Sequence, residues 1–112
     1  MKPANEYGVY EEGSIEELAR RGRSYAAVKT CQCEDGLFRY GLDLMYSYGG
    51  FSFPISSSQE GFASPIAAKE AGTVDLLEHF PTAWGSEPQS VHDELREMKA
   101  QIERNFCQPS LF

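Results

Sequence analysis

A chain of 112 residues is long enough for one domain with a modest core, and 41% hydrophobic with 12% aromatic residues exclude a disordered composition. A formal net charge of −7, from 17 acidic and 10 basic residues, disfavours tight binding to duplex nucleic acid, which depends on Lys and Arg at the phosphates. With three cysteines, no membrane-length apolar run and no apolar segment behind Met1, the sequence predicts a cytoplasmic protein with free thiols.

Residues 1–13 contain Gly and Glu without a lasting hydrophobic period, so we interpret them as a flexible arm with at most a short extended piece. Ser14 and Glu17 match a capping box, in which each side chain satisfies a backbone N–H at a helix start. This spacing predicts a short helix up to about Arg21, ended by Gly22. The helix would open a single domain over residues 14–106.

Three basic residues lie close together at Arg20, Arg21 and Arg23. They form a candidate nucleic-acid-binding patch, because cations neutralise phosphates. The alternative is a solvated helix end, where cations interact favourably with the helix dipole.

The clearest pair of elements is a hairpin over residues 25–33 and 37–46, in which apolar and polar residues alternate. Asp35-Gly36 is typical of a two-residue hairpin turn. The predicted register pairs Cys33 with Phe38, Cys31 with Tyr40, Lys29 with Leu42, Ala27 with Leu44 and Tyr25 with Tyr46. These pairs form the predicted core face, which leaves Arg39 and Asp43 exposed on the other face.

The chain then turns at Gly49-Gly50 into a third strand, with Phe51, Phe53 and Ile55 predicted on one face and Pro54 indicating a sheet edge. The aromatic residues at this turn are a second candidate protein interface, formed by Tyr46, Tyr48 and Phe51. Two alternatives remain for these three residues together with Phe53: packing in the core, and stacking on single-stranded bases. Base stacking is the less favoured of these, because binding to a nucleic acid needs cations and Arg39 is the only one from Cys31 to Gly61.

Two helices are predicted to follow. Ser64 as N-cap and Pro65 at the first position open one of them. Its predicted buried stripe is Ala67, Ala71, Val74, Leu77 and Phe80. Gly72 should cost about 1 kcal/mol relative to Ala unless another residue packs closely there. A last helix over about residues 88–105 carries a narrow apolar seam, formed by Val91, Leu95, Met98, Ile102 and Phe106. Such a helix lies on the domain or pairs with a second copy as a homodimer.

The order helix-strand-strand-strand-helix-helix predicts an α+β fold, with a three-stranded antiparallel sheet and helices packed on one face. This order resembles the double-stranded-RNA-binding-domain-like architecture, which many proteins adopt without binding RNA. The resemblance implies a small nucleic-acid-binding module as one alternative function.

The sequence offers no catalytic, metal-binding or cofactor-binding set. Cys31-Gln32-Cys33 has the wrong spacing for a zinc knuckle, and both thiols are expected to be buried. His79 and His92 stand on different predicted helices, and neither has a nucleophile signature near it. We therefore expect a non-enzymatic protein.

The chain ends in Gln108-Pro109-Ser110-Leu111-Phe112, which places two large apolar residues side by side. These residues resemble the short peptide with which bacterial replication and repair proteins bind the DNA polymerase sliding clamp. The resemblance implies that Leu111 and Phe112 fill an apolar pocket, while Gln108 and Ser110 form hydrogen bonds around it. The chain departs from the family pattern at Pro109, where an aliphatic residue is preferred. The alternative is an apolar staple, with Leu111 and Phe112 packed on the domain.

A second resemblance covers roughly residues 25–80. The segments 33–40, 46–51 and 62–64 are similar to small uncharacterised proteins of bacterial phages and integrated mobile elements. This resemblance implies a biological context and no activity. The leading hypothesis is an adaptor or modulator whose residues 107–112 are an exposed peptide that binds the sliding clamp, and whose folded domain binds an unknown second partner. A further alternative is a phage or mobile-element inhibitor that acts on a host enzyme by protein contact.

Overall fold

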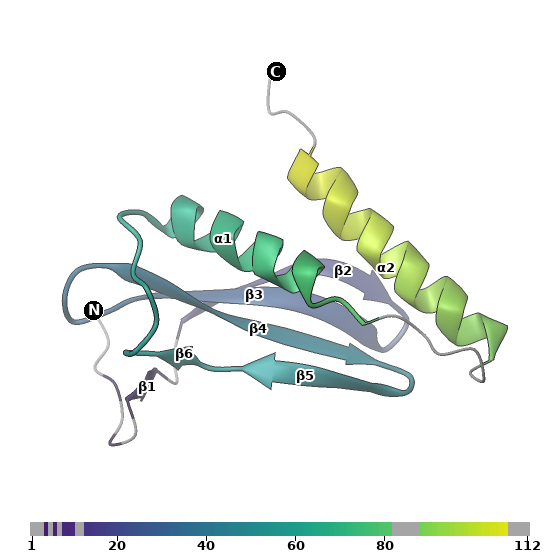
Figure 1. The fold of residues 1–112 in the computed structure, drawn as a ribbon, viewed down its shortest axis with the longest axis horizontal. Coiled ribbons are helices and arrows are strands. Elements are labelled where there is room, and N and C mark those ends of the chain that lie inside the picture. Colours follow the sequence, from purple (N-terminus) through teal and green to yellow (C-terminus); the bar gives the residue numbers. More distant parts are fainter. Residues whose placement is uncertain (1–3, 5, 7, 11–12, 82–87, 108–112) are drawn as a thin grey trace.

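The protein has an α+β fold, in which a four-stranded antiparallel sheet carries two helices on one face (Figure 1). The computed structural model describes the chain apart from residues 1–3, 5, 7, 11–12, 82–87 and 108–112, and apart from the side chains of residues 106 and 107. The strands of the sheet, in spatial order, are β2 (Ser14–Arg21), β3 (Ser24–Gln32), β4 (Phe38–Tyr46) and β5 (Gly49–Phe53). A separate ribbon pairs β1 (Val9–Tyr10) with β6 (Ile55–Ser56), and the helices are α1 (Pro65–Glu78) and α2 (Gln89–Cys107).

The helix predicted at the start of the domain is wrong, because residues 14–21 form the edge strand β2. The sheet therefore has four strands rather than three, and the element order is not the one expected of a double-stranded-RNA-binding-like fold. The register of β2 against β3 shifts between Glu17 and Ala19, which is a β-bulge. Leu18 and Ala19 are consequently both buried although they are neighbours. Two adjacent buried apolar residues are also typical of the apolar face of a helix, which explains the wrong prediction.

The hairpin of β3 and β4 forms as predicted, but its register is wrong by one residue. The connection contains three residues rather than two: Gly36 N donates to Cys33 O over 2.9 Å, and Cys33 N donates to Leu37 O over 2.7 Å. Gly36 takes a φ of 85°, which is typical of the last residue in a three-residue hairpin loop. The three-residue loop pairs Val28 with Leu42 and Cys31 with Arg39.

This shift exchanges the two faces of β3. Ala26 and Val28, rather than Ala27 and Lys29, join Leu42 and Leu44 beneath the helices. The predicted exposure of Arg39 is wrong, since the residue is only 8% exposed. The thiols of Cys31 and Cys33 are buried as predicted, but on the face opposite the helices, where they pack with Tyr10 and Ile55 in a second apolar cluster.

β5 lies at the edge of the sheet, as Pro54 predicted. Phe51 and Phe53 pair with Leu44 and Leu42 and thus lie on the helix side. Ile55 does not share their face: the strand ends at Phe53, and Ile55 begins β6 and packs in the second cluster.

α1 begins as predicted, with Ser64 Oγ accepting from Ala67 N over 3.1 Å and Pro65 in the first turn. Its buried face is rotated from the predicted stripe and consists of Ala68, Gly72, Thr73 and Leu76. Val74, predicted to be buried, is 42% exposed. A Cβ at Gly72 would lie 2.9 Å from Val28 Cγ1 and 3.0 Å from Tyr40 Cδ1. The close approach of helix and sheet therefore explains this glycine.

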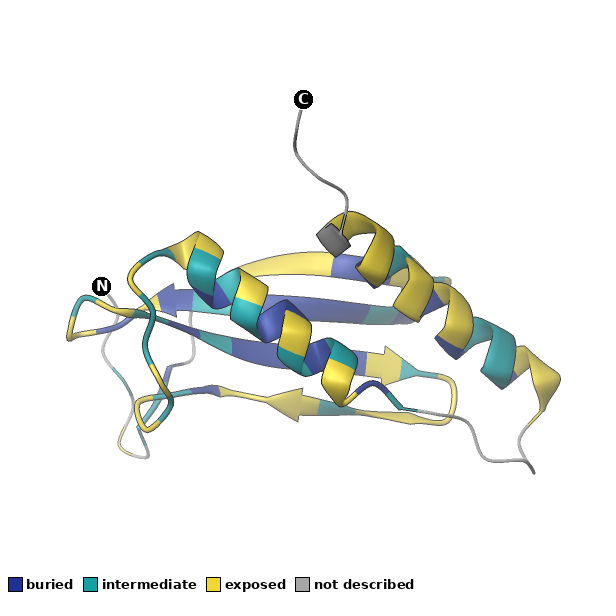
Figure 2. Cartoon of the chain, turned by 45° about the horizontal axis from the view of Figure 1, so that its top comes forward, coloured by how far each residue is buried: buried dark blue, intermediate teal, exposed yellow. Residues whose placement is uncertain are grey.

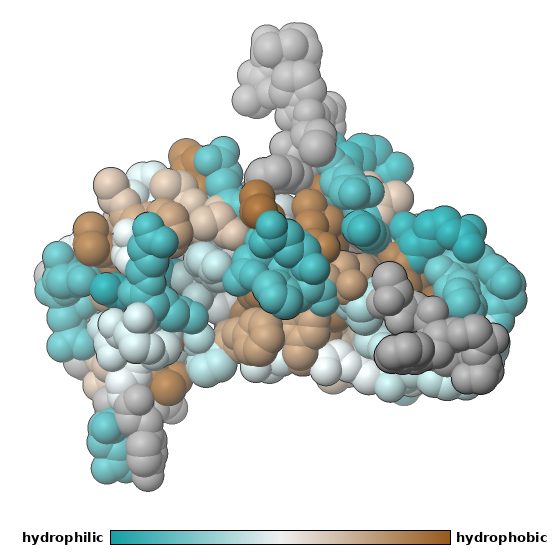
Figure 3. Space-filling view, viewed as in Figure 1, coloured by the Kyte–Doolittle hydropathy of each residue, from teal (hydrophilic) through white to brown (hydrophobic). Residues whose placement is uncertain are grey.

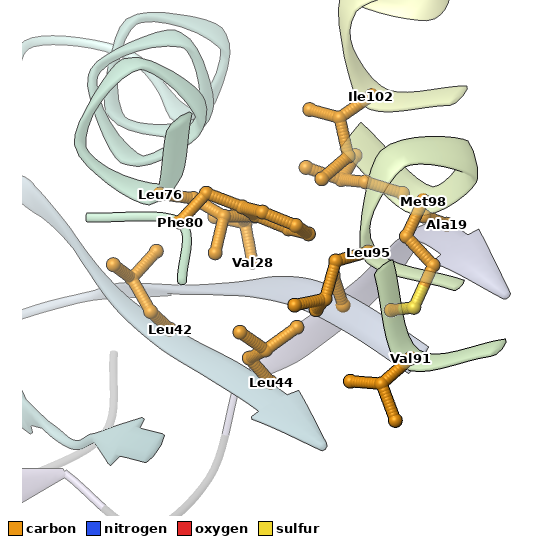
Figure 4. Close-up of a cluster of buried hydrophobic side chains, with 12 residues drawn as sticks. Ala19, Val28, Leu42, Leu44, Leu76, Phe80, Val91, Leu95, Met98 and Ile102 are labelled. Carbon is orange, nitrogen blue, oxygen red and sulfur yellow. The ribbon is translucent and has the colours of Figure 1, made fainter. Parts of the chain in front are cut away.

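α2 carries the predicted seam, and the described part of it is buried: Val91, Leu95, Met98 and Ile102 are at most 4% exposed. These side chains join the main core between the helices and the sheet (Figure 4). α2 therefore lies on its own domain, and the described seam is not exposed for pairing with the helix of a second copy. Within the described residues, neither helix combines the length and apolarity needed to cross a membrane.

Candidate protein-binding surface

The predicted clamp-binding peptide, Gln108, Pro109, Ser110, Leu111 and Phe112, lies outside the described residues. What the structure describes is its attachment point. α2 ends at Cys107, and Glu103, Arg104 and Asn105 in its last turn are exposed. In Figure 1 this end of the helix rises away from the sheet. Ile102 is the last residue of α2 in the described part of the main core.

The predicted basic patch is divided by the sheet. Arg20 lies 5.5 Å from the ring centre of Tyr25 and pairs with Glu17 over 2.6 Å. Arg21 points to the other face and pairs with Glu97 of α2 over 3.5 Å. Arg23 is exposed in the turn between β2 and β3. Two of the three cations are therefore neutralised by carboxylates, and the three do not form one surface.

The outer edge of β2 is closed by a side chain of α2. Arg20 N donates to Gln101 Oε1 over 2.9 Å, and Gln101 Nε2 donates to Arg20 O over 3.2 Å. The carboxamide thereby occupies the place of one peptide group of a neighbouring strand. With the bulge at Glu17 and four charged residues along the strand, β2 has the features by which proteins prevent edge-to-edge association.

The outer edge of β5 has none of these features. From Leu44 to Gln59 the chain contains no charged residue. Gly49, Gly50, Ser52 and Phe53 are exposed, and β5 appears largely yellow in Figure 2. The surface over β5 is white to brown in the space-filling view, whereas teal covers much of α2 (Figure 3).

Two aromatic rings stand on this edge. Phe51 and Phe53 are stacked with their ring centres 5.0 Å apart and their planes inclined by 27°. Phe51 packs against the main core, and Phe53 is 44% exposed. The pair forms an apolar ridge beside Leu44 and Leu42 on the helix side of the sheet.

Of the other aromatic residues predicted at this surface, Tyr46 packs against the core, and Tyr48 is 58% exposed in the turn. The turn is held by α2, because Glu94 accepts from both Ser47 N and Ser47 Oγ over 2.8 Å. Burial alone would raise the pKa of Glu94, but the hydrogen bonds from Ser47 outweigh it and hold the pKa below its ordinary value. The charged carboxylate thus fixes Ser47, the residue before Tyr48. Phe53, which the sequence placed in the base-stacking alternative but not in the protein interface, completes the surface.

A group of titratable residues on the opposite face has a structural explanation. Tyr10 Oη donates to Glu34 Oε1 over 3.1 Å, and burial together with this bond raises the pKa of Tyr10 to about 12. Arg39 donates from both terminal nitrogens to Asp35 over 3.0 and 2.9 Å, which lowers the pKa of that carboxyl. Arg39 Nε also donates to Gln59 O over 2.8 Å. These contacts attach β1 and the loop after β6 to the β3–β4 turn.

The structure also brings together a histidine, a carboxylate and a tyrosine that sequence reasoning did not connect. Asp75 accepts from Tyr40 Oη over 2.8 Å and lies 2.8 Å from His79 Nδ1. Burial and the bond to Asp75 raise the pKa of Tyr40 to about 12. The i, i+4 spacing of Asp75 and His79 was visible in the sequence, whereas the approach of Tyr40 depends on the fold. No described serine or cysteine hydrogen-bonds to this histidine, so the set lacks a nucleophile.

Two concave sites adjoin β2. A cavity of about 510 Å³ lies between the ribbon and the sheet and includes Tyr10, Ile15, Lys29 and Ile55 in its wall. A cavity of about 320 Å³ lies between β2 and the start of α1. Within the described ranges, no three His, Cys, Asp or Glu side chains are grouped so that they could hold a metal ion.

The geometry of β5 therefore supplies the best-defined candidate surface, and it is one suited to protein contact. No protein-family model matches the chain, and neither does any curated protein or solved structure.

Proposed function

We propose that the protein is a non-enzymatic adaptor or modulator that binds the bacterial DNA polymerase sliding clamp through Gln108, Ser110, Leu111 and Phe112. The folded domain would carry the second binding partner, and the peptide would bring that partner to the clamp. We also propose that the protein acts in the cytoplasm, where the replication machinery is found.

The observation that carries this proposal is the burial of the described part of the α2 seam against the sheet and α1. Leu95, Met98 and Ile102 of α2 are at most 4% exposed and pack with residues of both the sheet and α1. The residues that follow, Glu103 to Asn105, are exposed. The described domain therefore leaves no unfilled part of the α2 seam that would call for Leu111 and Phe112. This supports a role for the two residues in binding.

The chemistry of the peptide is consistent with docking. Burying Leu and Phe side chains contributes roughly 1.5–3 kcal/mol each. Gln108 offers an acceptor and two donors that can fix the register of the peptide on backbone groups. Pro109 disfavours helical backbone at Gln108, in agreement with the end of α2 at Cys107. Pro109 also restricts the unbound peptide and so reduces the entropy lost on docking.

The nucleic-acid alternative has less support. Arg20 and Arg21 are paired with Glu17 and Glu97, and they lie on opposite faces of β2. With a net charge of −7, we expect duplex DNA or RNA to bind more weakly than about 10 μM at physiological salt. A fluorescence anisotropy titration that shows tighter, salt-sensitive binding would restore this alternative.

Calorimetry with purified bacterial sliding clamp tests the proposal. The full chain should bind with a dissociation constant of about 1 μM, as expected for a short apolar peptide. Leu111→Ala with Phe112→Ala should abolish measurable binding. A matched control replaces two exposed isoleucines of the folded domain, Ile15→Ala with Ile66→Ala, and should bind as the unmodified chain does.

A thermal melt of the same proteins separates docking from the staple alternative. If Leu111 and Phe112 serve the clamp, the double alanine variant melts within about 1–2 °C of the unmodified chain, because little core burial is lost. If the variant melts several degrees lower and no protein binds the clamp, the two residues are a staple and the proposed function is wrong.

A further inference from the structure

The two edge strands of the sheet, β2 and β5, differ in whether their outward backbone groups are hydrogen-bonded. At β2 the carboxamide of Gln101 bonds the outward N–H and C=O of Arg20. At β5 no described residue outside β4 donates to or accepts from the backbone of residues 49–53. In an antiparallel pair, every second residue turns its N–H and C=O away from its partner strand. With respect to the described part of the chain, β5 therefore presents backbone groups without a partner on an exposed edge.

We propose that β5 pairs antiparallel with β5 of a second copy of this chain, which makes one continuous sheet across a two-fold axis. The strand is suited to pairing with itself. With Phe51 opposite Phe51 at the axis, Phe53 of each copy lies opposite Gly49 of the other, and Gly50 lies opposite Ser52. An aromatic ring beside a cross-strand glycine covers the backbone that the glycine leaves open. The two stacked pairs of Phe51 and Phe53 then form one apolar ridge on the helix side.

Charge is compatible with this contact although each copy carries −7. The segment from Leu44 to Gln59 contributes no charge at the interface. Repulsion between charges elsewhere on the two copies is screened over about 8 Å at physiological ionic strength. We therefore expect the dimer to strengthen as salt is raised, whereas an interface held by ion pairs would weaken.

The contact is small, because only the five residues of β5 pair in each copy. A strand pair of this length with one aromatic ridge falls at the low end of specific interfaces. We expect a dissociation constant on the order of 100 μM, which corresponds to a weak and reversible dimer. The inference does not depend on the proposed clamp binding, since it uses no residue of the C-terminal peptide.

Sedimentation equilibrium of the full chain from about 10 μM to 1 mM, a range around the expected constant, tests the proposal. Phe53→Lys should weaken the dimer by about tenfold or more, because it removes a ring and places a cation on the edge. Ile15→Lys is the matched control: it changes an exposed apolar residue on β2 and alters the net charge equally. Both variants lower the negative charge, so general repulsion cannot explain a loss seen only with Phe53→Lys.

Hydrogen exchange of the unmodified chain gives a second readout that does not require a variant to fold. Amides of Gly50 and Ser52 should become protected as concentration rises, while the amide of Tyr48 in the turn should not. The Leu111→Ala, Phe112→Ala protein should dimerise normally. A chain that stays monomeric at 1 mM, a dimer that survives Phe53→Lys, or a dimer lost with the tail variant would each overturn the proposal.

Discussion

Gln101 and Arg20 form a two-bond contact between a helix side chain and the backbone of an edge strand. The carboxamide oxygen accepts from Arg20 N over 2.9 Å, and the carboxamide nitrogen donates to Arg20 O over 3.2 Å. One side chain thus pairs the outward backbone groups of Arg20 and fixes α2 to β2. Two apolar neighbours of Arg20, Leu18 and Ala19, are buried beneath the same helix. The contact therefore lies at the boundary between the core and the sheet edge.

Replacing this carboxamide should destabilise the fold. Gln101→Ala removes two hydrogen bonds, each worth about 0.5–1.5 kcal/mol, and leaves the Arg20 backbone groups to water. Because the site is partly exposed, water replaces some of the loss, and we expect the free energy of unfolding to fall by about 1–2 kcal/mol. Urea denaturation measures the change. Gln89→Ala is the control: Gln89 is exposed and, among the described residues, its side chain bonds to Asp93, so its loss should be within about 0.5 kcal/mol.

Gly72 should not tolerate a methyl group although it lies within a helix. Gly72→Ala gains about 1 kcal/mol of helix propensity. The new Cβ would lie 2.9 Å from Val28 Cγ1 and 3.0 Å from Tyr40 Cδ1, and overpacking of this kind costs about 1–3 kcal/mol. We expect a net loss of stability in urea. A variant more stable than the unmodified protein would show that α1 moves away from the sheet at little cost.

His79 should titrate above its ordinary range. The bond from its ring to the Asp75 carbonyl, followed by the charge of Asp75, raises its pKa above 6.5. A raised folded pKa contributes stability that is complete below 6.5 and is lost as pH rises through the folded value. His79→Gln should therefore reduce the difference in urea midpoint between pH 6 and pH 8. NMR titration of the His79 ring checks the pKa itself, and a value of 6.5 or below would contradict the assignment.

The elements that the sequence predicted correctly depend on local chemistry. Ser64 and Pro65 start α1, the spacing of Val91 to Ile102 gives the seam of α2, and Pro54 indicates an edge. The errors arose where one residue changes a register. The bulge at Glu17 buries two neighbours in β2 and imitates a helix. The third residue in the turn before Leu37 shifts β3 against β4 and reverses its faces.

The candidate surface could be predicted only in part. Tyr46, Tyr48 and Phe51 were chosen as aromatic residues beside glycines, a local signal. Phe53 was assigned to the same face as Phe51 and to the base-stacking alternative, but not to the protein interface, because its exposure depends on the end of the sheet at β5. The pairing of Gln101 with Arg20 spans 81 residues and has no sequence signal. The sequence already showed that no charged residue lies between Leu44 and Gln59. Only the strand order shows that this uncharged segment forms an edge of the sheet.

Arg39 provides the most direct test of the corrected register. In the observed pairing it lies opposite Cys31, is 8% exposed, and donates to Asp35 and to Gln59 O. Arg39→Leu keeps a bulky side chain but removes the hydrogen bonds that Arg39 donates to the Asp35 carboxylate and to the Gln59 carbonyl. Hydrogen bonds to charged groups contribute about 1.5–3 kcal/mol, so we expect a loss of about 2 kcal/mol in urea denaturation.

Arg96→Leu is the matched control for that experiment, because the Arg96 side chain is 72% exposed and forms a surface ion pair with Asp93 at 3.6 Å. Its effect should stay within about 0.5 kcal/mol, as for other surface ion pairs. The register first expected from Asp35-Gly36 places Arg39 in solvent, where the two substitutions would have equally small effects. Equal losses for Arg39→Leu and Arg96→Leu would therefore contradict the three-residue turn and the face assignment of β3 that follows from it.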